Sequence, residues 1–272
     1  MITIVTAFFD IGRGNWPRVI RGRELPPYQH RPNDVYFYYF EKLARVKNPM
    51  VIFTQPEFEH VVHEIRNHHG NKNNTEVVVI TQEEISQFDP VLRKINNIMN
   101  DDEFINMINE PHLPEYWNAP YVMINFLKSW FVEKAYKENL VKTELSAWID
   151  FGYVRDENNL PPSLKWDYSF NPEKIHMFQM RDIEPSRPVS NIIATGDVYI
   201  QGCHIVSSEK GWSLLWKLMQ ETISWAIDNR LIDDDQTFLY LSYLQESESF
   251  ELHQGDPNNW FMIFNRFNNM RE

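Results

Sequence analysis

The chain has 272 residues and a mass of 32.6 kDa, and 43% of its residues are hydrophobic and 14% aromatic, so it can bury a large core and is not intrinsically disordered. Its 26 basic and 38 acidic residues give a formal net charge of -12, and no local basic stripe is present, which excludes nucleic acid as an expected partner. Cys203 is the only cysteine, which excludes an intramolecular disulfide and a cysteine-built zinc site and favours a reducing cytoplasm.

The sequence contains no pattern typical of a signal peptide or a membrane span. Residues 1–9 are apolar, but no basic region precedes them and Asp10 follows too soon for a signal peptide. No segment reaches the ~20 uncharged apolar residues that cross a bilayer, and Lys128 interrupts the most apolar one, 121–132. We therefore expect a cytoplasmic protein without a transmembrane segment. Peripheral contact with the inner face of the inner membrane stays open as an alternative.

The first 80 residues alternate between strand and helix patterns. Short β-branched and aromatic runs predict strands at 2–9, 50–53 and 76–80, and helical spacing of apolar residues predicts helices at 33–46 and 57–69. Strands that alternate with helices are typical of a mainly parallel sheet covered by helices. The sequence therefore predicts the α/β class.

The remainder of the chain is less regular because prolines interrupt it. The stretch 82–120 is predicted to form short helical pieces broken by prolines, and 156–188 to be mostly loop. The other predicted elements are a helix at 121–139, a strand at 145–151, two short strands within 192–206 on either side of Gly196, and helices at 209–229 and 234–245.

Asp150 is the strongest local candidate for chemistry. It ends an apolar strand pattern and stands two residues before Gly152. Ligands bind at the carboxyl ends of the strands of an open parallel sheet, and a carboxylate there is a hard ligand for Mg2+ or Mn2+. The alternative is that Asp150 caps a turn. The Asp-Phe-Gly triplet at 150–152 also occurs in protein kinases, but no glycine-rich loop and no His-Arg-Asp segment accompany it, which excludes a kinase.

Two further segments hold candidate residues. His253 lies shortly before Gly255 near the end of the chain, where it is either a metal ligand or a polar loop residue. Three aspartates, 233–235, precede an apolar helical stripe; capping of the helix explains one or two of them and leaves one for an active site.

Other motifs point to no particular chemistry. The spacing of His60, His63, His68 and His69 differs from the His-Glu-x-x-His metal motif and predicts a solvated helix face. The glycines of the segment 12–14 do not complete a dinucleotide-binding fingerprint.

Two segments give the chain a family resemblance. The opening run Thr-Ile-Val-Thr-Ala-Phe-Phe-Asp-Ile-Gly-Arg at 3–13 and the motif Trp-Ile-Asp-Phe-Gly at 148–152 resemble the HtrL/YibB family of bacterial proteins. The resemblance extends over nearly the whole chain. That family is associated with lipopolysaccharide and surface-polysaccharide gene clusters and is regarded as glycosyltransferase-like with a GT-A fold.

The resemblance implies one GT-A-like domain over 1–272, with a nucleotide-sugar-binding half at 1–152 and an acceptor-side half at 153–272. The implied activity is transfer of a sugar from a nucleotide-sugar donor, first of all a UDP-sugar, to a lipid-linked or oligosaccharide acceptor such as lipopolysaccharide core, O-antigen or capsule. We expect a metal-dependent hexosyl- or N-acetylhexosaminyltransferase.

The GT-A comparison also assigns roles to residues. Asp150 matches the first Asp of the Asp-x-Asp metal motif, with Gly152 in place of the second, and His253 resembles a late histidine ligand; together they would hold Mn2+ or Mg2+. Asp234 and Asp235 resemble the acidic pair behind the reaction centre, and if the enzyme inverts the anomeric configuration, one of them would remove the acceptor proton. The donor-binding residues would be Thr6, Ala7, Phe9, Asp10, Arg13, Lys128 and Gly202, of which Arg13 and Lys128 would stabilise the departing phosphate.

Two other function classes compete with this reading. A degenerate metal motif is compatible with a non-catalytic protein that binds nucleotide sugars or polysaccharides. A sugar nucleotidyltransferase shares the α/β sheet and the diphosphate chemistry, but it normally has a glycine-rich phosphate loop, of which 12–14 is a poor version.

Overall fold

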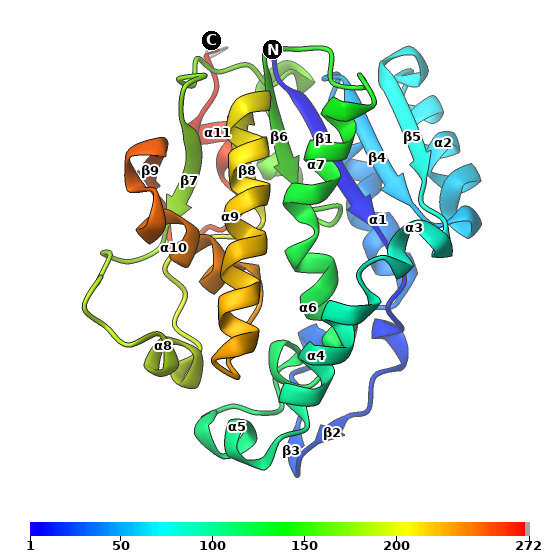
Figure 1. Cartoon of the computed structure of the whole chain (residues 1–272). Helices are drawn as coiled ribbons and strands as arrows, with labels where there is room; N and C mark the ends of the chain where they lie inside the picture. The colour runs from blue at the N-terminus through cyan, green and yellow to red at the C-terminus, as the bar shows by residue number, and fades with distance from the viewer. Residues whose placement is uncertain (270–272) are drawn as a thin grey trace.

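A seven-stranded sheet forms the centre of the computed structural model, which describes residues 1–269 (Figure 1). The strand order is β5-β4-β1-β6-β8-β7-β9, and β8 is antiparallel to both of its neighbours while the other neighbouring pairs are parallel. The strands are β1 Thr3–Phe8, β4 Met50–Thr54, β5 Thr75–Val79, β6 Leu145–Ile149, β7 Ile175–Gln179, β8 His204–Ser208 and β9 Phe250–Gln254. A separate hairpin pairs β2 Val19–Ile20 with β3 Arg23–Glu24.

The central strands are short apolar runs because both of their faces are covered. Every residue of β4 and β6 is buried, and β1 is buried at all positions but Ala7. Continuous apolar runs of this kind are typical of parallel strands between two helical layers. These strands therefore hold the residues that follow their carboxyl ends in fixed positions.

Helices cover both faces of the sheet. One core layer packs α4, α6, α7, α9 and α10 against the sheet, and the other packs α1, α2 and α11 against the opposite face. In Figure 1, α7 and α9 lie side by side across one face. The helices are α1 Asn33–Leu43, α2 Glu59–His68, α3 Gln82–Ser86, α4 Asp89–Met99, α5 Asp102–Met107, α6 Ala119–Phe126, α7 Lys128–Lys137, α8 Val189–Thr195, α9 Glu209–Asp228, α10 Asp235–Gln245 and α11 Ile263–Arg266.

This architecture confirms the predicted fold class, α/β with a mainly parallel central sheet flanked by helices; the GT-A assignment stays what the family resemblance implies. The division of the chain into functional halves at residue 152 stays a prediction. None of the helices within residues 1–269 combines the length and the apolar character that crossing a bilayer requires.

Two local predictions were wrong. The helix expected at 121–139 is two helices, α6 and α7, which meet at Leu127, where ψ is -2°. The stretch 156–188 is mostly loop, as predicted, but it also contains the strand β7, which was not predicted. The first strand expected before Gly196 is instead α8; its β-branched residues suggested a strand, but Pro188 begins the helix and Gly196, at φ +64°, ends it.

Candidate functional site

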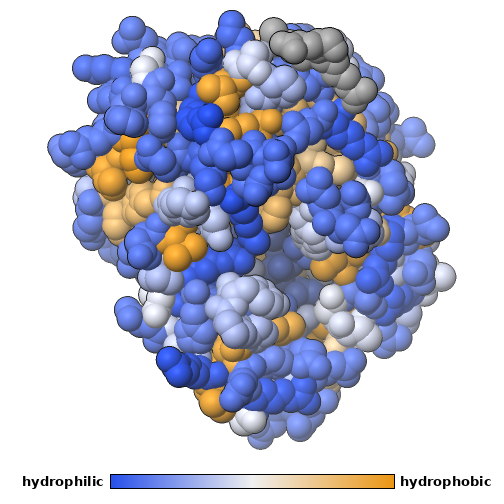
Figure 2. Space-filling model, turned by 180° about the vertical axis from the view of Figure 1, so that it is seen from behind, coloured by the Kyte–Doolittle hydropathy of each residue, from blue (hydrophilic) through white to orange (hydrophobic). Residues whose placement is uncertain are grey.

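A cavity of about 590 Å3 lies where the loops that follow β1 and β6 meet the start of α10. Figure 2 shows a hollow near the middle of the face turned away from the viewer in Figure 1, with mostly hydrophilic residues around it. The volume of the cavity is within the range of ordinary ligand sites. The cavity lies at the carboxyl ends of parallel strands, where α/β sheets bind ligands. The charged residues that line it are Asp10, Arg13, Arg31, Glu115, Lys128, Asp150, Arg155, Asp234 and Asp235.

Lys128 joins two of the predicted carboxylates in one ion-paired group. Its Nζ lies 2.9 Å from Asp235 Oδ2 and 3.1 Å from Asp150 Oδ1, and it donates a hydrogen bond of 2.9 Å to the Gly202 carbonyl. The side chains of Lys128 and Asp235 are 9% and 4% exposed, whereas that of Asp150 is 37% exposed and reaches the cavity. Lys128 therefore holds Asp150, from the end of β6, beside Asp235, from the start of α10.

The Lys128 ammonium keeps its charge around neutral pH. Burial alone disfavours the ammonium, but the carboxylates of Asp150 and Asp235 outweigh that effect and raise the pKa of Lys128 above its ordinary value. An ammonium has three N–H donors, and all three have acceptors here. Lys128 therefore positions Asp150 and Asp235, and its predicted contact with the departing phosphate stays a prediction.

Two neighbours fix the carboxylates. Trp148 Nε1 donates a hydrogen bond of 2.8 Å to Asp150 Oδ1. Gly202 packs so closely on Asp235 that a Cβ at position 202 would lie 2.0 Å from Asp235 Oδ2. Position 202 therefore requires glycine, because any side chain there would overlap the Asp235 carboxylate. The predicted role of Gly202 in donor binding stays a prediction.

The Lys128 ammonium competes with a divalent cation for these carboxylates. The oxygens of Asp150 and Asp235 that face each other already bind the Lys128 ammonium, and a second cation among them would be repelled at a distance of about 3 Å. A second carboxylate at position 152 would also be crowded, because a Cβ there would lie 3.3 Å from the Tyr36 ring. Binding of Mn2+ or Mg2+ by Asp150 stays a prediction.

Asp234 and Glu115 form an acidic pair on another wall of the cavity. Asp234 is the N-cap of α10, where its Oδ1 accepts a hydrogen bond of 3.0 Å from the Gln236 N–H. Burial and the neighbouring Asp235 and Asp233 raise the pKa of Asp234 well above its ordinary value. Burial and the charge of Asp234 raise the pKa of Glu115 to about 8. Carboxyl groups with raised pKa values can hold or exchange a proton near neutral pH, as general acids and bases do.

Arg13 lines the cavity, but its guanidinium is held by the protein. Its Nε donates to the Gln29 carbonyl at 2.9 Å, its Nη1 to the Tyr36 hydroxyl at 2.7 Å, and its Nη2 to Gln29 Oε1. The same guanidinium lies over the Trp16 ring at 5.2 Å. Arg13 thus fastens the loop after β1 to the segment before α1, and its predicted contact with phosphate stays a prediction.

Two arginines that line the cavity, Arg31 and Arg155, were not predicted from the sequence, and both have N–H groups without a hydrogen-bond acceptor within residues 1–269. Arg155 is exposed, lies 4.3 Å over the Phe261 ring, and its guanidinium has no hydrogen-bond partner among residues 1–269. Partial desolvation of its guanidinium and the nearby charge of Arg31 lower the pKa of Arg155. Arg31 uses its Nε on the Tyr28 carbonyl. Two neighbouring guanidinium groups of this kind attract an anion. Neither arginine lies in a recognisable sequence motif, so neither could be identified from the sequence.

The other predicted residues divide into two groups. Ala7, Phe9 and Asp10 line the cavity together with the residues described above. Thr6 does not line the cavity: it is fully buried within β1, two residues before Phe8, so the structure does not place it in a base pocket.

His253 does not join Asp150. It lies on β9 at the edge of the sheet, where its Nε2 is 2.9 Å from His176 Nδ1 and its ring stacks on Phe178 and packs against Phe267. It is absent from the cavity lining. The prediction of one metal site shared by His253 and Asp150 was wrong, because β9 was not recognised as a strand and its direction could not be foreseen.

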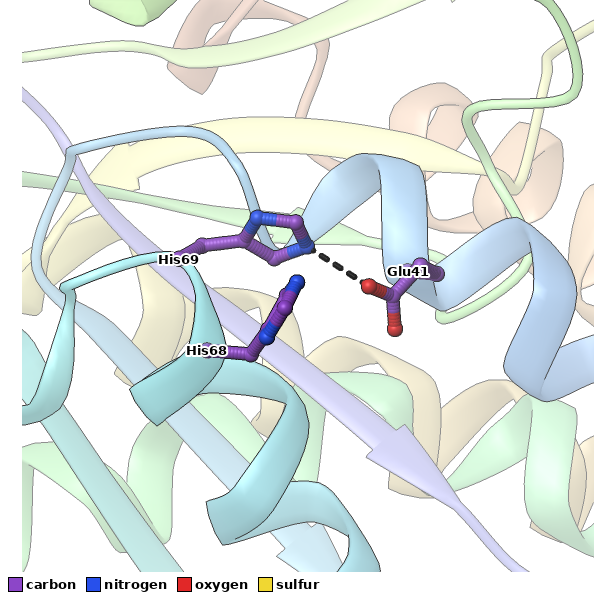
Figure 3. Close-up of side chains that lie close together, drawn as sticks. All are labelled: Glu41, His68 and His69. Atoms are coloured by element: carbon purple, nitrogen blue, oxygen red, sulfur yellow. Dashed lines mark hydrogen bonds and ion pairs between the residues drawn. The ribbon is translucent and has the colours of Figure 1, made fainter.

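The other histidine cluster is a helix surface, as the sequence indicates. Figure 3 shows His69 pointing toward Glu41 of α1, with Nε2 at 2.8 Å from the carboxylate, and His68 beside it. His68 is exposed, as is His60, whose side chain is 84% exposed.

The fold and the cavity together define an α/β protein with a charged cavity at the carboxyl ends of its parallel strands. The model of the family described as "Bacterial protein of unknown function (HtrL_YibB)" matches residues 1–269, and the chain belongs to this family. It is 36% identical to Protein HtrL of Escherichia coli strain K12 over 270 residues, which cover 97% of this chain and 92% of that protein. The predicted family is therefore confirmed.

Two solved structures resemble the chain at low identity. Mouse xyloside xylosyltransferase 1, in its apo form, aligns with 93% of this chain and 84% of its own at 10% identity and a TM-score of 0.39. The 4-diphosphocytidyl-2C-methyl-D-erythritol synthase of Anaerococcus prevotii aligns with 97% and 91% at 14% identity and a TM-score of 0.38. Both TM-scores are below 0.5, so neither similarity bears on the activity of this chain.

Proposed function

We propose that this protein is a glycosyltransferase that uses a nucleoside diphosphate sugar as its donor. The proposal rests on one observation: the same cavity is lined by guanidinium groups and by carboxyl groups. Arg31 and Arg155 provide guanidinium groups, and Asp150, Asp234 and Glu115 provide carboxyl groups. A nucleotide sugar has the matching chemistry, since its diphosphate is anionic and its sugar hydroxyls donate hydrogen bonds to carboxylates.

The arginines would bind the diphosphate. The guanidinium of Arg155 is unpaired among residues 1–269 and lies next to Arg31, so an anion between them would relieve their mutual repulsion. Guanidinium groups bind phosphate oxygens in pairs and would stabilise the negative charge that develops on the leaving nucleoside diphosphate. Aromatic rings in the cavity wall offer surfaces for the base: Phe9, Tyr28, Tyr121, Trp148 and Trp260.

The carboxyl groups would act on the sugar and the acceptor. The acceptor hydroxyl would attack the anomeric carbon as the bond from that carbon to the phosphate oxygen breaks, and its proton would pass to Asp234. Asp234 suits this role better than Asp235, because it lines the cavity without an ion-pair partner among residues 1–269, whereas Asp235 is bound to Lys128. Lys128 would keep Asp150 and Asp235 oriented toward the donor sugar.

The finer assignments rest on the family resemblance. We propose a UDP-sugar as the first donor to test and a bacterial surface glycan, free or lipid-linked, as the acceptor. The cytoplasmic side of the inner membrane is where such a donor and acceptor would meet.

A turnover screen tests the proposal. The purified protein is incubated with nucleoside diphosphate sugars and surface-glycan acceptors, and the release of nucleoside diphosphate and of pyrophosphate is measured. We expect acceptor-dependent release of nucleoside diphosphate, and Asp234→Asn should reduce it at least ~100-fold. Donor binding without turnover would support the non-catalytic alternative, and pyrophosphate release would support a nucleotidyltransferase; either result contradicts the proposal.

A further inference from the structure

The edge of the sheet brings together three side chains that the proposed active site does not use. β9 is the edge strand and runs parallel to β7, with His176 opposite Glu251 and Phe178 opposite His253. Alternate residues of a strand share a face, so Glu251 and His253 point to the same side of the sheet as His176. These three residues, called the β7–β9 cluster below, converge without any shared sequence motif.

The ligand atoms of the β7–β9 cluster are close to metal-binding distances. His176 Nδ1 is 2.9 Å from His253 Nε2, and the Glu251 carboxylate lies 3.7 Å from the first nitrogen and 4.0 Å from the second. Tetrahedral zinc with bonds of about 2.0–2.1 Å separates its ligand atoms by roughly 3.3 Å. Small adjustments of roughly 0.5 Å in each contact therefore produce the geometry.

A neighbouring carbonyl sets the tautomer of one imidazole. His176 Nε2 lies 2.8 Å from the Asn171 carbonyl, which can only accept, so the ring proton is on Nε2 and the lone pair of Nδ1 points at His253. A backbone carbonyl behind a histidine is the usual support of a metal-binding imidazole, because it fixes the ring and increases its basicity. Phe170 packs against His176, which is 1% exposed, and keeps its ring in place.

The cluster is also accessible to an ion. The side chain of Glu251 is 47% exposed and that of His253 15% exposed, so the cluster opens to solvent at the edge of the sheet. Two imidazoles and one carboxylate form a borderline-soft ligand set that suits Zn2+ and leaves a fourth position for water. The Arg266 guanidinium is close enough to act on His253 and opposes a cation, whereas the Glu251 carboxylate favours one.

We propose that His176, Glu251 and His253 bind one borderline divalent cation, with Zn2+ as the best match, and that the bound ion fastens the edge strand β9 to β7. The chain that follows β9 supplies Trp260 and Phe261 to the wall of the cavity. A cation at this edge would therefore stabilise one wall of the ligand site from outside it. The proposal does not depend on the activity proposed above.

Zinc binding by the metal-stripped full chain tests the proposal. Equilibrium dialysis with zinc alone, followed by elemental analysis, should give about one zinc per chain, and zinc should raise the melting temperature because it binds only the folded state. Glu251→Gln should weaken zinc binding at least ~10-fold without unfolding the protein, since the side chain is half exposed. His253→Gln should do the same.

The cluster of Glu41, His68 and His69 in Figure 3 provides the matched control. It has the same residue types but lies on a helix surface with an exposed His68, so the double variant Glu41→Gln/His68→Gln should bind zinc as tightly as the wild type does. The proposal is overturned if the wild type binds no stoichiometric zinc, if Glu251→Gln binds it unchanged, or if zinc binding is lost only in the control variant.

Discussion

Replacing Lys128 with methionine should destabilise the protein strongly, because it leaves Asp235 buried without a partner. The Lys128 and Asp235 side chains are 9% and 4% exposed and form the buried pair, at 2.9 Å. Removing one member of a buried pair typically costs about 3–5 kcal/mol. The contact with Asp150 adds little to this value, since Asp150 is 37% exposed and its pairing is screened by water. We therefore expect Lys128→Met to lower the free energy of unfolding by about 3–5 kcal/mol.

Urea denaturation of four proteins measures this effect: the wild type, Lys128→Met, Asp235→Asn and the double variant. The double variant should recover about 1–3 kcal/mol relative to the sum of the single changes, because it removes both charges together. Lys137→Met is the matched control, since its side chain is 69% exposed in an i,i+4 pair with Glu133, and it should change stability by less than ~1 kcal/mol. A loss for Lys128→Met no larger than that of the control, or additive single changes, would refute the reasoning.

Three further predictions concern the same cavity. Gly202→Ala should cost about 1–3 kcal/mol in urea denaturation, because its Cβ would overlap the Asp235 carboxylate, and an unchanged midpoint would contradict the close packing. The folded-state pKa of Glu115, about 8, lies above that of an unfolded glutamate, so the folded state keeps a proton that the unfolded chain loses. The free energy of unfolding should therefore fall as pH rises from about 5 to about 8, and Glu115→Gln should flatten this slope; an equally steep slope in the variant would show that other groups cause it. Arg155→Met should weaken nucleoside diphosphate binding ~10–100-fold in calorimetry with the fold intact, whereas the control Arg23→Met, which removes an exposed pair with Glu110 outside the cavity, should not.

The part of the site that could be predicted from the sequence lies where secondary structure gives a local signal. Asp150 follows a buried strand and Asp234 begins a helix, and both positions are fixed by patterns of a few residues. The sheet edge then brings them into one cavity. For the same reason the alternation of strands and helices in the first 80 residues predicts the parallel strands β1, β4 and β5.

The residues that were missed depend on contacts between distant segments. Arg31 and Arg155 lie in irregular loops more than a hundred residues apart, and no periodicity indicates that they meet. The two cations chosen from the sequence, Arg13 and Lys128, do reach the cavity, but only the structure shows that protein acceptors already bind their N–H groups. His253 was assigned to the wrong partner because β7 and β9, which give the β7–β9 cluster its geometry, were not predicted as strands.

A crystal structure of the protein with a bound nucleoside diphosphate tests the central claim most directly. The account predicts that the nucleotide occupies the cavity, that its phosphate oxygens lie within hydrogen-bonding distance of Arg155 and Arg31, and that its terminal phosphate is directed toward Asp234 and Asp150. A nucleotide bound outside the cavity, or one whose phosphates contact neither arginine, would contradict it.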